Sequence, residues 1–404
     1  MPESRSDSPS RVLYVTMAVL LIAAAAYFLF SYRSNRANKN QVANLYLTKA
    51  NALMQHDKFD EAADALDKAD LDNVQVQTEK FKAKIFTIAK QSDPLDRWLE
   101  LEKLDEAEAD CKRLLSVDPA SAELTALLGI VYAHKDRPAL AVETYKKASE
   151  LKPGYSNVRN YWGYTLYQWR FPDSDSWRLE ATKEFNEAKE LDPTYAWPRI
   201  NLAVLSALDG KFKDAISILS QTEEIAKDNE TLYSLWGTCL LLWGEQLQGK
   251  DKLAAYEKFS EALDRFRIAE ALNPNIAYRH LNNGNALADL GNVDGAISEY
   301  QKAIELEPDF IEAHQNIAGL LAKRQDTERK DLEGSLAHLT EAIRLTNRTI
   351  EQFNDRKTKT PDTHAQKILD QWIKDRVKDR TDSKDGVVKV TKMLQRKNSS
   401  GQKL

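Results

Sequence analysis

The sequence contains few of the residues that interrupt regular structure. Of its 404 residues 14 are glycine and 12 are proline, which is 3.5% and 3.0%, whereas average usages are about 7% and 5%. This scarcity argues against a turn-rich β protein and favours long helices. The two cysteines, Cys111 and Cys239, are too few for a disulfide scaffold or a cysteine-based zinc module.

Recognisable catalytic motifs are also lacking. The sequence has no Gly-x-x-x-x-Gly-Lys phosphate loop, no dinucleotide-binding glycine motif and no His-Glu-x-x-His. Both cysteines fall at apolar helical positions and are interpreted as small buried hydrophobic residues. We therefore expect no enzyme activity, no cofactor and no bound metal. The six histidines are scattered, with no pair at metal-ligand spacing: His56, His134, His280, His314, His338 and His364.

One long uncharged run lies near the start of the sequence. Residues 12–30 are 19 residues without a charge, and about 20 apolar residues are enough to cross a bilayer as a helix. A cleavable signal peptide is the alternative, but its apolar region is only about 7–15 residues long. The pattern predicts an N-terminal tail over 1–11, a transmembrane helix over 12–32 and a basic linker over 33–41.

This prediction implies a single-pass membrane protein attached through its N-terminal helix. The basic residues on the two flanks are nearly balanced, with three on one side against two and the α-amine on the other. Their distribution therefore does not determine the orientation of the helix. Unbridged cysteines favour the cytoplasmic side for the remainder of the chain.

The middle of the sequence is periodic, and its period of about 34 residues is that of tetratricopeptide-type helix–turn–helix repeats. Five prolines, each two positions after a Leu or Val, mark the period: Pro119, Pro153, Pro193, Pro274 and Pro308. The first and last intervals between them equal one period, the second is slightly longer, and the third exceeds two periods. Lys227 lies one period after Pro193 and takes the place of a missing proline. In such repeats proline ends one helix and begins the next.

Three columns of residues recur with this period. A small residue marks the first helix of each unit, a second small residue marks the second helix, and a bulky residue follows four positions later. Residues three and four apart share a helical face, so two helices can approach at the small residues and the bulky residue fills the adjoining gap. The columns are Ala50, Gly129, Gly163, Ala203, Gly237, Gly284 and Ala318; Ala62, Ala107, Ala141, Ala181, Ala215, Ala262, Ala296 and Ser335; and Leu66, Cys111, Tyr145, Phe185, Leu219, Phe266, Tyr300 and Leu339.

In these columns the chain resembles the tetratricopeptide repeat family. About eight units cover residues 42–346, and four of them are stretched by insertions or by lengthened helices. The predicted fold is all-α, an α-solenoid of about eight helix–turn–helix repeats preceded by one transmembrane helix. The resemblance implies that protein or peptide partners bind along a concave face formed by the first helices.

One candidate binding surface lies in the fourth unit. Asn160, Tyr164 and Tyr167 recur at three- and four-residue steps on the face that the resemblance assigns to the groove. Aromatic side chains with polar tips are favoured at interfaces because they bury area and keep a hydrogen bond. Ordinary packing between units is the alternative interpretation.

A second candidate surface lies in the seventh unit. Some members of the family hold a terminal carboxylate with a Lys/Asn/Asn/Lys/Arg clamp, for which Arg279, Asn282 and Asn285 are candidates here, together with Asn316. Leu281 stands where the first clamp lysine would be, so too few charged donors converge for a complete clamp. Asn282 and Asn316 also share a column in which asparagine is common in the family, which favours a structural role.

The repeat pattern ends near residue 346, and the last segment, residues 347–404, differs in composition. Residues 364–380 have the pattern of a charged amphipathic helix that could cap the last unit, and a flexible basic tail is predicted beyond residue 381. The total charge of −5 conceals a division: +3 over residues 1–41, +7 over 347–404 and therefore −15 over the repeats. An acidic solenoid argues against nucleic-acid partners, and no small-molecule substrate is expected.

These observations leave two classes of function. The first is a membrane-tethered scaffold or adaptor that binds protein partners through the concave face and assembles or localises a complex. The alternative is a dedicated regulatory subunit or assembly factor of one membrane enzyme or secretion machine. A further hypothesis is that the basic tail folds back on the acidic repeats and competes with a basic partner.

Overall fold

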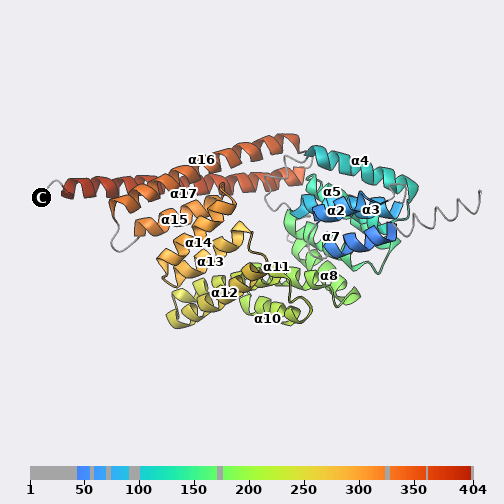
Figure 1. Cartoon of the computed structure of the whole chain (residues 1–404), viewed down its shortest axis with the longest axis horizontal. Helices are drawn as coiled ribbons and strands as arrows, with labels where there is room; N and C mark the ends of the chain where they lie inside the picture. Colours follow the sequence, from blue (N-terminus) through green and yellow to red (C-terminus); the bar gives the residue numbers. More distant parts are fainter. Residues whose placement is uncertain are drawn as a thin grey trace, which may run out of the picture. The chain divides into compact units, whose positions relative to one another are not determined.

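The computed structural model describes residues 43–54, 59–69, 74–90, 101–170, 176–323, 328–360 and 363–401. Within them every regular element is a helix and no strand is present, which confirms the all-α prediction. After the helical residues 43–54, the elements are α2 (Phe59–Leu66), α3 (Val74–Lys90), α4 (Leu101–Val117), α5 (Ala122–His134), α6 (Pro138–Leu151), α7 (Ser156–Trp169), α8 (Ser176–Leu191), α9 (Ala196–Leu208), α10 (Phe212–Thr222), the short 3-10 helix η2 (Glu223–Ile225), α11 (Glu230–Gln248), α12 (Lys252–Leu272), α13 (Ala277–Asp289), α14 (Val293–Leu306), α15 (Ile311–Lys323), α16 (Arg329–Lys359) and α17 (Thr363–Gly401) (Figure 1).

The chain divides into two compact units, one of residues up to 92 with 105–119 and one of 93–104 with 120–404. The first has its own apolar core, in which residues 43–50 pack with Ala62 and Leu66 of α2 and Val76 and Ala83 of α3. The second contains six consecutive helix pairs, from α5/α6 to α15/α16, each packed along its length. This succession of pairs is the predicted solenoid.

Close contact between the two helices of a pair depends on the predicted columns. A Cβ atom placed on Gly163 would lie 2.7 Å from the Phe185 ring, and one on Gly237 would lie 2.5 Å from the Phe266 ring. Both distances are below van der Waals contact, so a larger residue would force the helices apart. The second-helix and bulky columns are buried at every position, from Leu66 to Leu339, which confirms the packing expected from the sequence.

The turn within a unit uses a left-handed residue seven positions after the small residue of the first helix. Gly210 and Gly291 occupy this position with φ of 69° and 80°, whereas Asp136 and Arg170 occupy it with φ of 57° and 46°. Glycine adopts this conformation without steric cost and other residues do not. Asp136 and Arg170 are therefore held there by the surrounding structure.

The longest of the predicted insertions lengthens helices. Helix α11 has 19 residues and α12 has 21. Their added turns bring Gly244 against Phe259, where a Cβ would lie 2.5 Å from the ring. The pair therefore makes two glycine–aromatic contacts, that of Gly237 with Phe266 and, two helical turns further along α11, that of Gly244 with Phe259.

The expectation of a single-pass membrane protein is corrected by the structure. Among the described helices none is both long and apolar enough to cross a bilayer. The longest, α17, has charged residues distributed along its length. The predicted span 12–32 and its flanks 1–11 and 33–41 lie outside the described residues, so membrane localisation has no support in the structure.

The last two helices form a hairpin, which we call the C-terminal hairpin (α16 and α17). The two helices have 31 and 39 residues and lie side by side (Figure 1). Helix α17 continues to Gly401, whereas the sequence predicted a flexible tail beyond residue 381. The difference has a physical reason: Val390 is 2% exposed and packs in one core cluster with Leu332 and Leu339 of α16 and Ala318 of α15.

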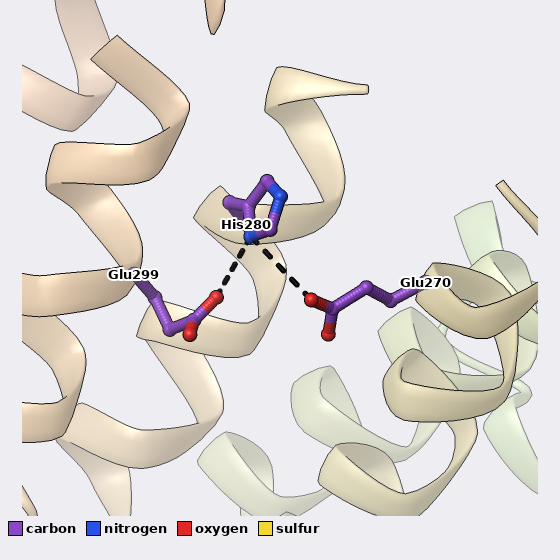
Figure 2. A group of neighbouring side chains, drawn as sticks. All are labelled: Glu270, His280 and Glu299. Carbon is purple, nitrogen blue, oxygen red and sulfur yellow. Dashed lines mark hydrogen bonds and ion pairs between the residues drawn. The ribbon is translucent and has the colours of Figure 1, made fainter. Parts of the chain in front are cut away.

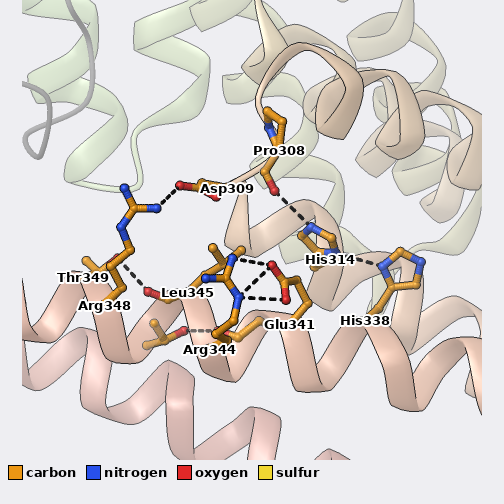
Figure 3. A network of polar contacts seen from close by, with 11 residues as sticks. Pro308, Asp309, His314, His338, Glu341, Arg344, Leu345, Arg348 and Thr349 are labelled. Carbon is orange, nitrogen blue, oxygen red and sulfur yellow. Dashed lines mark hydrogen bonds and ion pairs between the residues drawn. The ribbon is translucent and has the colours of Figure 1, made fainter.

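Polar contacts attach α16 to α15 and to the turn that precedes it (Figure 3). Arg348 pairs with Asp309 at 2.5 Å. His314 Nδ1 lies 2.9 Å from His338 Nδ1, and His314 Nε2 lies 3.3 Å from the carbonyl oxygen of Pro308. Polar contacts of α16 thus occur both at the buried His314 and at the exposed Arg348.

The far end of the C-terminal hairpin is held by a buried ion pair, which we call the Asp136–Arg356 lock. Arg356 of α16 is 2% exposed and donates two hydrogen bonds to the carboxylate of Asp136, one of them 2.8 Å long. Thr360 donates a third, at 3.2 Å. Trp372 of α17 lies beside the lock, with its ring centroid 5.9 Å from that of Trp169 of α7. The left-handed turn at Asp136 thus places a carboxylate where an arginine 220 residues later can reach it.

Candidate functional site

The face available for a partner follows from helical geometry. Relative to the small residue of a first helix, positions −6, −3, +1, +4, +5 and +8 fall along one side, about a quarter of a turn from the side that packs against the second helix. We call this the first-helix face. It includes the predicted Tyr164 and Tyr167 on α7, and also Trp197, Glu245, Tyr278, Asp289, Glu312 and Gln315 on later first helices.

The predicted tyrosines of α7 form part of an aromatic cluster. Tyr164 is 45% exposed, and its ring lies edge-on to Tyr167 with centroids 6.0 Å apart. Tyr167 also contacts Trp177 of α8, with centroids 6.3 Å apart. Burial raises the pKa of the Tyr167 hydroxyl, and the neighbouring Tyr164 adds to the rise. The cluster therefore consists of one exposed ring supported by two more buried rings.

The predicted asparagines connect neighbouring units. Asn160 of α7 accepts a hydrogen bond from Asn201 of α9 at 2.9 Å, and its own amide donates to the Tyr195 hydroxyl at 3.2 Å. In the same way Asn285 of α13 accepts from Asn316 of α15 at 2.9 Å. These bonds fix the spacing of successive first helices, so Asn160 and Asn285 support the surface on which the tyrosines lie.

The remaining two predicted residues are buried in α13. Arg279 is 4% exposed, donates to the carbonyl oxygen of Asn273 at 2.6 Å and pairs with Glu230 at 3.0 Å. Asn282 is 3% exposed, and its amide nitrogen has no hydrogen-bond partner among the described residues. Arg279 therefore connects α13 to the residue that follows α12, Asn273, and to the first residue of α11, Glu230.

A pair of carboxylates lies further along the first-helix face. Burial raises the pKa of Asp289 at the end of α13 to about 6, and the carboxylate of Glu245 on α11 adds to the rise. Burial also raises the pKa of Glu245. Neither carboxylate has a hydrogen bond or ion pair with another described residue. Two negative groups repel each other here with no cation from the described part of the chain between them.

Part of the first-helix face is already covered by the C-terminal hairpin. Arg376 of α17 pairs with Glu312 of α15 at 2.7 Å. Gln315 of the same helix donates to Ser383 of α17 at 2.9 Å. The basic helix α17 therefore packs on the face of α15, whereas Tyr164 and Tyr278 on earlier first helices stay exposed.

A separate pocket of about 400 Å³ lies among α8, α9 and α10. It is lined by four cations, Arg178, Lys189, Arg199 and Lys211, and by Asp209. Each cation already has an internal partner: Asp209 pairs with Arg178 and with Lys211, Lys189 donates to Asn186, and Arg199 donates to a backbone carbonyl. The charges that line this pocket are therefore already engaged within the protein.

The cysteines and several of the histidines are packed between helices in the described part of the chain. Both cysteines are free and buried, and burial raises the pKa of Cys239 to about 12, so its thiol stays protonated and unreactive. The histidines are less isolated than their sequence spacing indicated. His280 lies between Glu270 and Glu299, and His314 contacts His338.

Three features escaped sequence reasoning: the carboxylate pair, the His280 cluster and the Asp136–Arg356 lock. A signal for the first was present, because Glu245 and Asp289 lie eight and five positions after the glycines of their first helices, on the same helical side as Tyr164. All three features join residues of different elements. Nothing in a single sequence brings Arg356 to a turn 220 residues earlier.

The comparisons with known proteins agree with this architecture. Residues 99–156 match a family model described as tetratricopeptide repeat, and residues 284–325 match one described as TPR repeat. Stress-induced-phosphoprotein 1 of Caenorhabditis elegans is 22% identical in a match over 170 residues that covers 37% of this chain and 53% of that protein. The chain thus spans about half the length of this curated relative.

Solved structures resemble the fold at low sequence identity. The Cut9–Hcn1 hetero-tetramer of the APC/C matches with a TM-score of 0.56 and 17% identity, over 83% of this chain and 58% of that chain. Human IFIT1 with PPP-AAAA matches with a TM-score of 0.55 and 15% identity, over 89% and 85%. The matched repeat models and the packed columns show that the chain contains tetratricopeptide repeats, and these likenesses show that it has the fold of such repeat proteins.

Proposed function

We propose that this protein is a non-enzymatic scaffold whose first-helix face, from α7 to α13, binds a basic and partly apolar segment of a partner protein. The repeat fold supports a protein-interaction scaffold in general, since stacked repeats form extended binding surfaces. The nature of the partner segment is inferred from the side chains exposed on that face.

The observation that carries the proposal is the carboxylate pair of Asp289 and Glu245. A half-buried carboxylate with a raised pKa destabilises the free protein at neutral pH, because its ionised form is incompletely solvated. A lysine or arginine of a partner would lie between two negative groups and remove their repulsion. Charge-assisted contacts of this kind are about twice as strong as neutral hydrogen bonds.

The C-terminal hairpin provides an internal example of such a contact. Arg376 of the basic helix α17 pairs with Glu312, which occupies the first-helix face of α15. The same chemistry, a cation against an acidic residue of this face, is proposed for the partner on α11 and α13. We propose further that α17 limits the partner to the earlier units and competes with it at the boundary.

Apolar contact is supplied at the other end of the surface by Tyr164 and Tyr167. The exposed ring of Tyr164 lies against Tyr167, which in turn contacts Trp177. Aromatic residues supported in this way often contribute much of a binding free energy. The net charge of −15 over residues 42–346 repels phosphates and disfavours a nucleic-acid partner.

The proposal is tested by selecting peptides from a random display library on the full chain. We expect the selected peptides to be enriched in lysine, arginine and apolar residues. Their affinity should fall about 30-fold in the Tyr164→Ala, Tyr167→Ala double variant and about tenfold in Asp289→Asn.

Matched controls lie on second helices. Leu179→Ser on α8 removes an apolar side chain that is 75% exposed, and Asp264→Asn on α12 removes a carboxylate that is 71% exposed. Both should leave affinity unchanged. Peptides without basic enrichment, or peptides whose affinity is insensitive to the first-helix variants, would refute the proposed surface.

A further inference from the structure

Three side chains from three successive helices converge between the sixth and seventh units (Figure 2). Glu270 comes from the end of α12, His280 from α13 and Glu299 from α14. His280 Nδ1 lies 2.8 Å from Glu299 Oε2 and 3.8 Å from Glu270 Oε1. One ligand atom from each residue lies within 4.8 Å of the other two.

The tautomer of His280 follows from the backbone on its other side. Its Nε2 lies 3.2 Å from the carbonyl oxygen of Pro274, which can only accept a hydrogen bond, so Nε2 carries the proton. In the neutral ring Nδ1 then presents a lone pair to two carboxylates, which also only accept. With this tautomer Nδ1 is available to coordinate a cation together with an oxygen of each carboxylate.

Neighbouring residues hold both carboxylates in place. Asn283, which is 2% exposed, donates from Nδ2 to Glu270 Oε2 at 2.8 Å, and Lys302 donates to Glu299 Oε1 at 2.8 Å. Each carboxylate thus keeps its other oxygen directed at His280. The Oδ1 atom of Asn283 is buried without a hydrogen-bond partner in the described part of the chain, so rotation of the amide would present a carbonyl oxygen to an ion beside Glu270.

The next unit contains the same histidine with different partners. His314 follows His280 by one period of the repeat, and its Nε2 likewise lies 3.3 Å from a proline carbonyl oxygen, that of Pro308. His338 takes the place of Glu299, each three positions after the small residue of its second helix, and Ile304 takes the place of Glu270. The acidic pair is therefore particular to His280 and is not imposed by the repeat.

We propose that Glu270, His280 and Glu299 bind a divalent transition-metal ion of the Zn²⁺ class. One imidazole nitrogen and two carboxylate oxygens form a mixed ligand set that suits such an ion. A fourth position remains for the Asn283 carbonyl or a water molecule. The ion enters from the side of Glu270, whose side chain is 29% exposed, and joins α12, α13 and α14 across the boundary between two units.

The test uses the full, tag-free chain after dialysis against a chelator, titrated with Zn²⁺ in a calorimeter and with Co²⁺ by visible absorption. We expect one ion per chain, with the absorption of a Co²⁺ centre bearing a nitrogen ligand. Glu270→Gln and Glu299→Gln should each weaken Zn²⁺ binding more than tenfold, and Asn283→Ala should weaken it about 10–100-fold. Zinc should raise the Tm of the wild type and not that of Glu270→Gln.

His314→Ala is the matched control, because it removes the equivalent histidine of the next unit. It should bind Zn²⁺ with wild-type affinity, and circular dichroism confirms that each variant is folded. The absence of stoichiometric Zn²⁺ binding, or binding that is unchanged in both glutamine variants, would overturn the proposal. An equal loss in His314→Ala would overturn it as well.

Discussion

The helix pairs α5 to α15 and the C-terminal hairpin are stabilised in different ways. Each pair is held by the same short-range contact, a glycine or alanine of the first helix against an aromatic or aliphatic side chain of the second, as at Gly163 and Phe185. The C-terminal hairpin depends at its far end on the Asp136–Arg356 lock, between residues 220 positions apart. Packing that repeats locally forms the solenoid, whereas the hairpin combines apolar packing, as at Val390, with polar contacts that occur once.

The two kinds of contact therefore differ in what a single substitution does to the structure. Deleting an apolar contact in a stacked array affects the neighbouring units, because each unit buries the face of the next. A buried ion pair contributes little net free energy when intact, yet its disruption leaves an uncompensated charge. One substitution in the lock should therefore loosen the end of the hairpin near Thr360 while the repeats stay assembled.

The largest effect is expected from breaking the lock. Arg356→Met leaves Asp136 buried without its arginine partner, which should cost about 3–5 kcal/mol locally. Hydrogen exchange should accelerate in α17 and in the second half of α16, with protection retained in α7 to α14. Arg344→Met, on the exposed side of the same helix, is the control and should change neither region. Equal loss of protection throughout the repeats would show that hairpin and solenoid form one cooperative structure.

The next largest effect on stability is expected from a substitution within the solenoid. Gly237→Ala places a methyl group about 2.5 Å from the Phe266 ring, so the unfolding free energy should fall by about 1–3 kcal/mol. Gly154→Ala, at a position with no atom within 4 Å of the new methyl group, should be nearly neutral. Chemical denaturation of both variants measures the difference. Equal stability of the two would contradict the role assigned to the glycine column.

The fold could be predicted from sequence to the extent that it depends on local periodicity. The columns of small and bulky residues identified the helix pairs, and Tyr164 and Tyr167 were placed together by helical spacing. The helical C-terminal half of α17 was not predicted, because residues beyond 381 are mostly polar and the few apolar ones, such as Val390, are held by Leu332 and Leu339 of α16. The roles of Arg279 and Asn160 depended on partners in neighbouring helices.

A smaller effect concerns the boundary between solenoid and hairpin. Burial lowers the pKa of His338 below its usual 6.5, and the adjoining His314 lowers it further. The folded chain then binds fewer protons than the unfolded chain, so this contribution to stability is present above pH 6.5 and is lost as the pH falls. The Tm should decrease by a few degrees on mild acidification, and less so in His338→Asn, whose amide can donate to His314 without titrating. An identical pH dependence in both would assign the effect to other groups.

The smallest effect on stability tests the proposed binding surface. Because the ionised Asp289 is unfavourable in the free protein, Asp289→Asn should raise the unfolding free energy at neutral pH, on the order of 1 kcal/mol once solvent screening is allowed for. The gain should disappear as the pH falls below about 6, where Asp289 is protonated. Thermal denaturation at several pH values measures it, and a loss of stability at neutral pH would contradict the assignment.

The most direct test of the proposed function is the affinity of a selected basic peptide for the wild type and Asp289→Asn across this pH range. The wild-type affinity should fall as the pH decreases through about 6, the pKa of Asp289, whereas the variant should bind weakly with a much flatter pH profile. Parallel pH profiles with equal affinity would contradict the claim that this carboxylate pair receives a cation of the partner.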